Sequence, residues 1–174
     1  MRLSWYGEEV RHVIEAGMRR NLEKAALFVE TEAKRNARSG GPAGFKSSRG
    51  GAGLVGTITH EVKYPVARIG TNIKYGRIHE LGGTIVPATA GALTVPLARE
   101  ARKAKAKDFP DAFLLKLGSK AFIVQSVGRG KRAHLKFLYV LKDSVHMPAR
   151  PYLRPALDNN IARIRELLGT PIRG

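Results

Sequence analysis

The segment EEVRHVIEAGMRRNLEKAALFVETEAKRNA, residues 8–37, is the one from which the fold is best inferred. Its apolar residues recur at steps of three and four, which is the spacing of one face of an α-helix. These residues are Val10, Val13, Ile14, Met18, Leu22, Ala25, Phe28 and Val29. No proline interrupts the segment, and the helix-ending sequence Gly40-Gly41-Pro42 follows it. It therefore predicts a long amphipathic helix whose apolar stripe packs on a sheet.

A hairpin and a short helix are expected after the long helix. Residues 54–64 alternate between apolar and polar side chains, as one strand of a half-buried sheet does. Pro65 ends that run, and residues 66–71 predict the partner strand. Residues 73–81 predict a short helix that ends at Gly82-Gly83 and turns three side chains inward, Tyr75, Ile78 and Leu81.

More strands and one more helix are expected in the second half of the chain. Three runs predict strands, residues 113–117, 121–127 and 135–141. The last run alternates so that Leu135, Phe137, Tyr139 and Leu141 share a face. The prolines of residues 147–155 predict an extended arm, and a final helix follows with Leu157, Ile161, Ile164 and Leu168 on its stripe.

The order of these elements predicts the fold class. A long N-terminal helix, a hairpin, a short central helix, further strands and a C-terminal helix are typical of an α+β domain. We expect an antiparallel sheet of about four to six strands with the three helices packed on it. The length of 174 residues suits one domain spanning residues 1–174.

The amino-acid composition narrows the classes of protein to which this chain can belong. The chain has no cysteine, so disulfides and thiolate metal sites are excluded. No apolar run approaches the roughly 18 residues of a membrane span, and we expect a protein made in a cytoplasm with no membrane partner. Lys and Arg number 31 against 14 Asp and Glu, a net charge of +17. Such a surplus favours acidic partners, either nucleic acid or an acidic protein surface.

Motifs for catalysis are weak in this sequence. Residues 51–56 match GxGxxG, but a dinucleotide site needs a strand before the motif and a helix after it, and here a loop precedes and a strand follows. His79-Glu80 begins like HExxH, yet position 83 is glycine. A nuclease would need carboxylates such as Glu61, Glu80 and Asp143 to converge. We predict no catalytic, cofactor-binding or metal-binding residue and expect a protein that is not an enzyme.

The basic residues cluster in three segments, 38–49, 99–107 and 129–136. The first lies in a Gly/Ser-rich stretch, residues 38–53, that predicts a flexible basic loop. The second lies in a basic, alanine-rich insertion, residues 97–112, and the third surrounds a hairpin tip. Candidate contacts to DNA or to an acidic partner are Arg38, Lys46, Arg49, Arg102, Lys103, Lys105, Lys107, Arg129, Lys131 and Arg132.

Three stretches carry a resemblance to a known family: RIGTNIKYGRIHELGG at residues 68–83, GALTVPL at 91–97 and VHMPARPYLRPAL at 145–157. In this order they resemble the phage virion morphogenesis proteins, which include the Mu-type G protein and its relatives among tail-completion and neck proteins. The resemblance spans roughly residues 8–168. The first and third motifs are specific together and weak alone, and residues 97–112 match no fixed element of the family.

The resemblance implies a structural virion protein with the α+β fold that the pattern also predicts. Its relatives form rings, often hexameric, at the top of the tail or in the neck. Expected partners are further copies of the chain, a connector or head-closure protein, a tail-tube or tail-terminator protein, and packaged double-stranded DNA. We expect such a protein at the head–tail interface of the virion, and in the host cytoplasm during assembly.

The proline-stiffened arm of the third motif is a candidate subunit contact, because a stiff arm loses less entropy on docking. Its candidate residues are Arg150, Tyr152, Leu153 and Arg154.

A different function stays open from the sequence, a basic nucleic-acid-binding module that acts in the cytoplasm. Phe137 and Tyr139 lie in a basic strand and could stack on bases. Against this, the expected alternation places both on the face of Leu135 and Leu141, which is typical of core residues.

Overall fold

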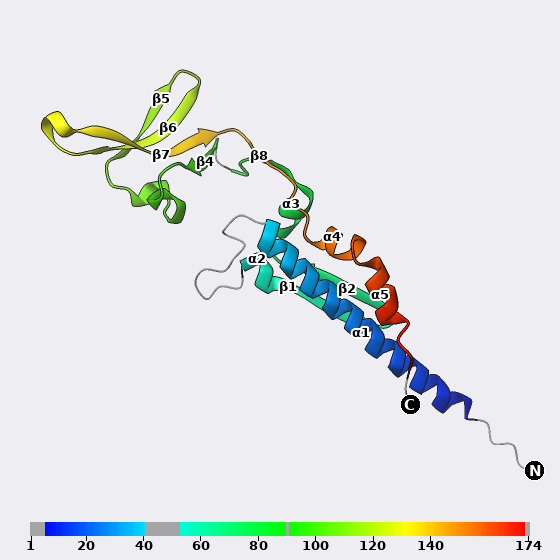
Figure 1. Cartoon of the computed structure of the whole chain (residues 1–174). Coiled ribbons are helices and arrows are strands. Elements are labelled where there is room, and N and C mark those ends of the chain that lie inside the picture. Colours follow the sequence, from blue (N-terminus) through cyan, green and yellow to red (C-terminus); the bar gives the residue numbers. More distant parts are fainter. Residues whose placement is uncertain (1–5, 41–52, 90, 173–174) are drawn as a thin grey trace, which may run out of the picture. The chain divides into compact units, whose positions relative to one another are not determined.

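The computed structural model describes residues 6–40, 53–89 and 91–172 (Figure 1). The chain divides into two compact units where the sequence suggests one domain. Unit 1 comprises Met1–Gly82 and Pro148–Gly174, and unit 2 comprises Gly83–Met147. Unit 2 is therefore inserted into unit 1, and it separates the first motif of the resemblance from most of the third.

The predicted long helix is confirmed as α1, Gly7–Gly40. Within unit 1 it packs against the hairpin and the C-terminal helices (Figure 1). Its buried positions recur at steps of four, and most of their side chains are small, which allows a close approach of the neighbouring elements. These positions are Gly17, Asn21, Ala25, Val29, Ala33 and Ala37, and Ala26 and Glu30 are buried beside them.

The buried stripe of α1 differs from the predicted one in its first turns. Val10, Val13, Ile14 and Met18 are each between 44 and 55% exposed. The expectation that they pack on a sheet is wrong, because the buried stripe begins only at Gly17. The first three turns of α1 thus carry an apolar stripe that unit 1 leaves exposed.

The hairpin begins later than the alternation predicts. Residues 53–57 form a short helix, α2 (Gly53–Thr57), and strand β1 (Ile58–Lys63) pairs antiparallel with β2 (Val66–Thr71). Leu54 and Ile58 are fully buried in the core of unit 1. The predicted loop 38–53 contributes its first residues to α1, and residues 41–52 lie outside the described part of the chain.

The predicted short helix is present as α3, Gly76–Leu81, but it turns a different face inward. Tyr75 and Leu81 are 45 and 63% exposed, whereas Gly76 and His79 are buried. A Cβ on Gly76 would lie 2.6 Å from Cγ2 of Thr71 and 3.1 Å from the hydroxyl oxygen of Tyr152. The inward position is therefore a glycine because neighbouring side chains already fill the space.

The C-terminal segment forms two helices, α4 (Leu153–Asp158) and α5 (Ile161–Leu168). The expected extended arm ends earlier than predicted, because Pro155 lies in the first turn of α4, where a helix needs no N–H donor. Only part of the expected apolar stripe of the C-terminal segment packs against the core of unit 1. Ile164 contacts the core cluster, while Leu157, Ile161 and Leu168 are 43 to 50% exposed.

Unit 2 holds two antiparallel sheets, so the expected single sheet is replaced by three in the described chain. Its outer strands β3 (Gly83–Ile85) and β8 (Val145–Met147) pair where the chain enters and leaves the unit. The larger sheet has the order β4-β7-β6-β5. Its strands are β4 (Leu93–Pro96), β5 (Ala112–Leu117), β6 (Lys120–Val127) and β7 (His134–Lys142), which confirms the three predicted strands.

A β-bulge corrects the predicted face of β7. Val124 of β6 pairs with Phe137, whereas Ile123 pairs with Tyr139, so Leu138 is an extra residue in the ladder. Phe137 and Tyr139 consequently lie on opposite faces of the sheet, and the expectation that they share one is wrong. Leu138 and Tyr139 are buried at 0 and 3% exposure, while Phe137 is 36% exposed.

The face that carries Tyr139 is covered by the segment between β4 and β5. This segment contains two 3₁₀ turns, η2 (Glu100–Lys103) and η3 (Ala106–Asp108). Ala101, Leu138 and Tyr139 form a core cluster here, and Phe109 packs against it. Residues 97–112, expected as a basic insertion, are thus a folded part of unit 2.

Candidate functional site

The first and third motifs of the resemblance meet through the carboxylate of Glu80. The backbone N–H groups of Tyr152 and Leu153 donate to its Oε2 at 2.7 and 2.9 Å. The N–H of Arg154 donates to its Oε1 at 2.9 Å. These donors belong to the start of α4 and have no partner within that helix. Glu80 thus caps a helix 72 to 74 residues further along the chain.

Two further hydrogen bonds join the same segments, and a third ties the second of them to α1. The N–H of Arg150 donates to the carbonyl oxygen of His79 at 2.7 Å. The hydroxyl of Tyr152 donates to the carbonyl of Gly76 at 3.4 Å, and the side-chain amide of Asn36 donates to the carbonyl of Tyr152 at 3.2 Å. We call these contacts and those of Glu80 the motif clamp. It holds together the chain on both sides of the inserted unit 2.

Two residues that the sequence suggests for catalysis, His79 and Glu61, make contacts that are typical of structural residues. His79 is buried, its ring meets that of Tyr75 edge-on at 5.8 Å, and burial with the nearby charge of Arg150 lowers its pKa. Glu61 forms an exposed ion pair with Lys63 at 2.6 Å. In the described part of the chain, no group of three or more His, Cys, Asp or Glu side chains could hold a metal ion.

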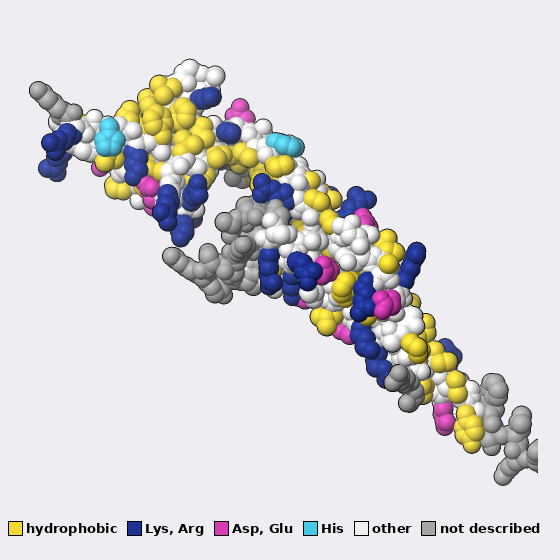
Figure 2. Space-filling view, in the orientation of Figure 1, with side chains coloured by type: hydrophobic (Ala, Val, Ile, Leu, Met, Phe, Trp, Pro, Cys, Tyr) yellow, Lys and Arg dark blue, Asp and Glu magenta, His cyan; other side chains and the backbone are white. Residues whose placement is uncertain are grey.

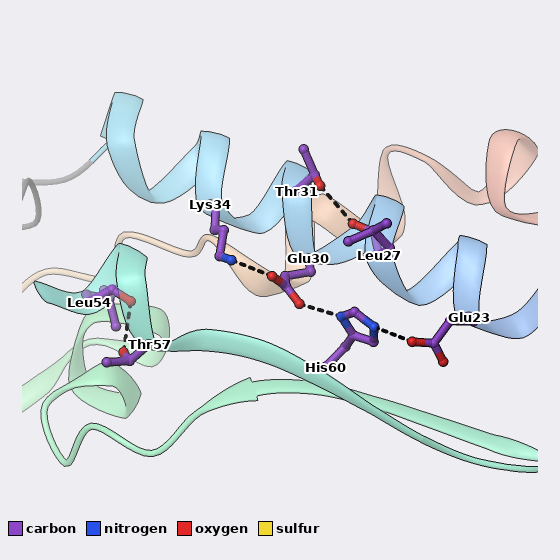
Figure 3. A network of polar contacts seen from close by, with 8 residues as sticks. All are labelled: Glu23, Leu27, Glu30, Thr31, Lys34, Leu54, Thr57 and His60. Atoms are coloured by element: carbon purple, nitrogen blue, oxygen red, sulfur yellow. Dashed lines mark hydrogen bonds and ion pairs between the residues drawn. The ribbon is translucent and has the colours of Figure 1, made fainter. Parts of the chain in front are cut away.

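A partly buried ionic network links α1 to β1 (Figure 3). Glu30, which is 8% exposed, binds the ammonium of Lys34 and Nδ1 of His60. Nε2 of His60 lies 2.9 Å from the carboxylate of Glu23. Hydrogen bonds to Glu30 and Glu23 raise the pKa of His60 above its ordinary value of 6.5. Burial raises the pKa of Glu30, but the hydrogen bonds and charges of Lys34 and His60 outweigh burial and lower it below 4.5.

These shifts predict a pH dependence of stability. Charged His60 stabilises the folded state fully below pH 6.5, and this contribution is lost as the pH rises through its raised pKa. The Glu30 contribution is present above pH 4.5 and is lost as the pH falls. We expect His60→Gln to cost on the order of 1 kcal/mol at pH 5.5 and less at pH 9. Urea unfolding at both pH values measures this, and a cost that does not change with pH contradicts it. His12→Gln, at an exposed site on α1, is the matched control.

The predicted basic insertion exposes its cationic side chains to solvent, while other residues of the same segment pack in the core of unit 2. Arg102, Lys103, Lys105 and Lys107 are exposed, while Ala101 is 2% exposed. The hydroxyl of Tyr139 donates to the carbonyl oxygens of Ala101 and Ala104, at 3.1 and 2.7 Å. Exposed cations on an ordered segment can bind phosphate or carboxylate groups without first ordering the backbone.

We expect Tyr139→Phe to loosen this segment. The substitution leaves two carbonyl groups of the segment without their donor, at a cost of about 1 to 2 kcal/mol. Cleavage by trypsin after Arg102 or Lys103 then becomes roughly tenfold faster, because proteolysis follows the population of the opened segment. Tyr75→Phe, at a tyrosine that is 45% exposed, provides the control. An unchanged cleavage rate contradicts the anchoring role of Tyr139.

The other candidate contacts to DNA or to an acidic partner lie in several parts of the chain. At the tip of the β6–β7 hairpin, Arg129 precedes the turn η4 (Gly130–Arg132) and Arg132 ends it, and both are exposed; Lys131 lies within that turn. Arg38 is exposed in the last turn of α1 and not in a loop. Lys46 and Arg49 lie outside the described residues. Unit 2 therefore carries seven of the ten predicted cations.

The four candidate subunit-contact residues divide into two kinds. Tyr152 is 1% exposed and Leu153, which is partly buried, packs against the same core, so both side chains contribute to the packing of unit 1, and their contact with another subunit stays a prediction. Arg150 and Arg154 are exposed. The residue that the sequence analysis missed is Glu80, considered only as a possible nuclease carboxylate. The pairing of the two motifs was the one signal that pointed to their contact.

Comparisons of the chain with protein-family models, with curated proteins and with solved structures found no match. Within the described ranges, no helix has the length and apolar character needed to cross a membrane.

Proposed function

We propose that the protein is a structural subunit of a long-tailed bacteriophage virion. It forms a ring at the head–tail interface that joins the tail to the head around the DNA channel, and it has no catalytic role. The ring consists of copies of this chain, and its neighbours are a connector or head-closure protein and a tail-tube or tail-terminator protein.

The observation that carries the proposal is the motif clamp. The two stretches most specific to the resemblance lie far apart in the sequence, yet Glu80 of one binds three backbone N–H groups of the other. Contact between the two motifs supports the idea that they belong to one inherited structure. Three backbone N–H groups occupy the carboxylate of Glu80, which suits a structural role.

The charge of unit 2 also supports a position beside DNA or an acidic ring. Unit 2 holds twelve Lys and Arg but only four Asp and Glu. A ring whose channel is lined by such a unit attracts phosphate at long range, and its cations replace the counterions of the duplex.

Electron microscopy of particles produced without this protein tests the function. We expect filled heads and finished tails that remain separate, and restoration of joined virions when the intact chain is supplied. Joined, normal virions in the absence of the protein contradict the proposal.

The exposed cations of residues 102–107 also favour a second candidate, a cytoplasmic module that binds nucleic acid as a monomer. A DNA gel shift over a range of salt concentrations, combined with sedimentation of the free protein, separates the two. Salt-sensitive DNA binding by a chain that forms no ring at any concentration favours the module. Concentration-dependent ring formation favours the virion subunit.

A further inference from the structure

Unit 1 exposes an apolar surface on the first turns of α1. Tyr6, Val10, Ile14 and Met18 follow one another at steps of four and so lie on one side of the helix. They are between 44 and 60% exposed. With Tyr64, whose hydroxyl lies 3.4 Å from the sulfur of Met18, they line a mostly apolar groove. We call these five residues the helix face.

Unit 2 exposes a second apolar surface on its four-stranded sheet. The register of the strands, including the bulge at Leu138, places ten apolar side chains on the face opposite Tyr139. Figure 2 shows hydrophobic side chains gathered over β5 and β6 of this unit. We call this set the sheet face, and it consists of Leu93, Val95, Phe113, Leu115, Leu117, Phe122, Val124, Leu135, Phe137 and Val140.

The sheet face is ordered but uncovered. The rings of Phe122 and Phe137 meet edge-on at 5.2 Å, and Val124 beneath them is fully buried. Phe113, Leu117 and Leu135 remain 44 to 51% exposed. The 3₁₀ segment of unit 2 covers only the opposite face, through Tyr139. Contiguous apolar surface of this kind marks a protein contact.

The two faces differ in charge. The charged residues that line the groove of the helix face are Arg11 and Glu15, and they neutralise each other in an ion pair at 3.0 Å. The sheet face belongs to the strongly basic unit 2, and the register places Lys120 and Lys142 on that same face. Two sheet faces brought together would repel each other, whereas a neutral helix face meets a sheet face without that repulsion.

We infer that the helix face of one copy docks on the sheet face of the next copy. An apolar helix stripe on an apolar sheet face is the ordinary way in which protein layers pack. Because each copy uses one face and offers the other, the contact is head-to-tail, and association continues until a ring closes or a filament grows. The inference rests on the proposed role as a ring subunit and supplies its subunit interface.

Two substitutions separate the faces. Ile14→Glu alters the helix face and Phe113→Glu alters the sheet face, each at a side chain that is 44% exposed, so that folding is preserved. Both introduce the same charge, and the two altered faces therefore cannot pair with each other. Leu157→Glu, at a residue of α4 that is 50% exposed and outside both faces, is the matched control. Circular dichroism and hydrogen exchange verify that all three variants fold like the original chain.

Sedimentation of the full chain over a range of concentrations gives the result. We expect the original chain and Leu157→Glu to form large assemblies, and each face variant alone to remain a monomer of 19.0 kDa. An equimolar mixture of the two face variants forms a complex of two chains and grows no further, because one intact helix face meets one intact sheet face. Such a capped pair is specific to a head-to-tail contact.

The inference is overturned if the original chain stays monomeric, if either face variant assembles normally, or if the mixture gives no two-chain complex. A ring that survives both substitutions removes this interface and leaves the ring function in place. Joined virions produced without the protein remove the function, whatever the sedimentation shows.

Discussion

Replacing Tyr152 by alanine is expected to lower the free energy of unfolding of unit 1 by about 4 kcal/mol, because a large side chain leaves a cavity in a packed core. Tyr152 is 1% exposed and belongs to the cluster that includes Val29, Leu54 and Ile58. Hydrogen exchange of the α1 amides in the full chain measures the loss. A cost below about 1 kcal/mol contradicts the packing described here.

The hydroxyl of Tyr152 contributes less than its ring. Burial and the charge of Glu80 raise the pKa of Tyr152 to about 12, so the hydroxyl stays protonated and donates to the carbonyl of Gly76 at neutral pH. That hydrogen bond is long, at 3.4 Å, and we expect Tyr152→Phe to cost at most about 1 kcal/mol. The difference between the two variants assigns the stabilisation to the aromatic ring.

Sequence periodicity predicts well those helices and strands whose apolar residues recur at a regular spacing within one segment. Steps of three and four over residues 8–37 predict α1, and the strand patterns of residues 113–117 and 121–127 predict β5 and β6. Each of these patterns depends on neighbours within the same segment, so its type follows from the segment alone.

The faces of those elements depend on distant residues and are predicted less well. A single extra residue, Leu138, turns Tyr139 to the opposite side of the sheet, where its hydroxyl meets carbonyl groups of residues 101 and 104. Gly76 is buried because the hydroxyl of Tyr152, 76 residues away, lies against it. The spacing of residues within one segment indicates neither of these contacts.

The types of residue in the candidate site can be predicted from the sequence, but their arrangement in space cannot. The three basic segments are visible in the sequence, and the cations at residues 102–107, 129 and 132 are indeed exposed. The insertion of unit 2 between the motifs is not visible, because no shift in composition marks its ends at Gly83 and Met147. Nor does the sequence show that unit 1 leaves the apolar stripe in the first turns of α1 about half exposed, since an exposed apolar stripe has the same spacing as a buried one.

Removing the carboxylate of Glu80 is expected to loosen unit 1 and leave unit 2 folded. Glu80→Ala leaves three backbone N–H groups at the start of α4 without their acceptor, at a cost of about 3 kcal/mol. Unit 2 has its own core around Leu138 and Tyr139 and does not use these bonds. Hydrogen exchange should therefore become faster in α4 and stay unchanged in β6 and β7.

Two comparisons make this prediction specific to the clamp. Glu80→Gln keeps one oxygen acceptor and is expected to lose roughly half as much stability, because its amide nitrogen cannot accept an N–H. Glu61→Ala removes an exposed carboxylate from the same unit and is expected to change the stability very little, because water screens the pair that it forms with Lys63. Equal losses for Glu80→Ala and Glu61→Ala contradict the clamp. Faster exchange in β6 and β7 shows instead that the inserted unit depends on the clamp for its fold, because the chain enters and leaves unit 2 beside it.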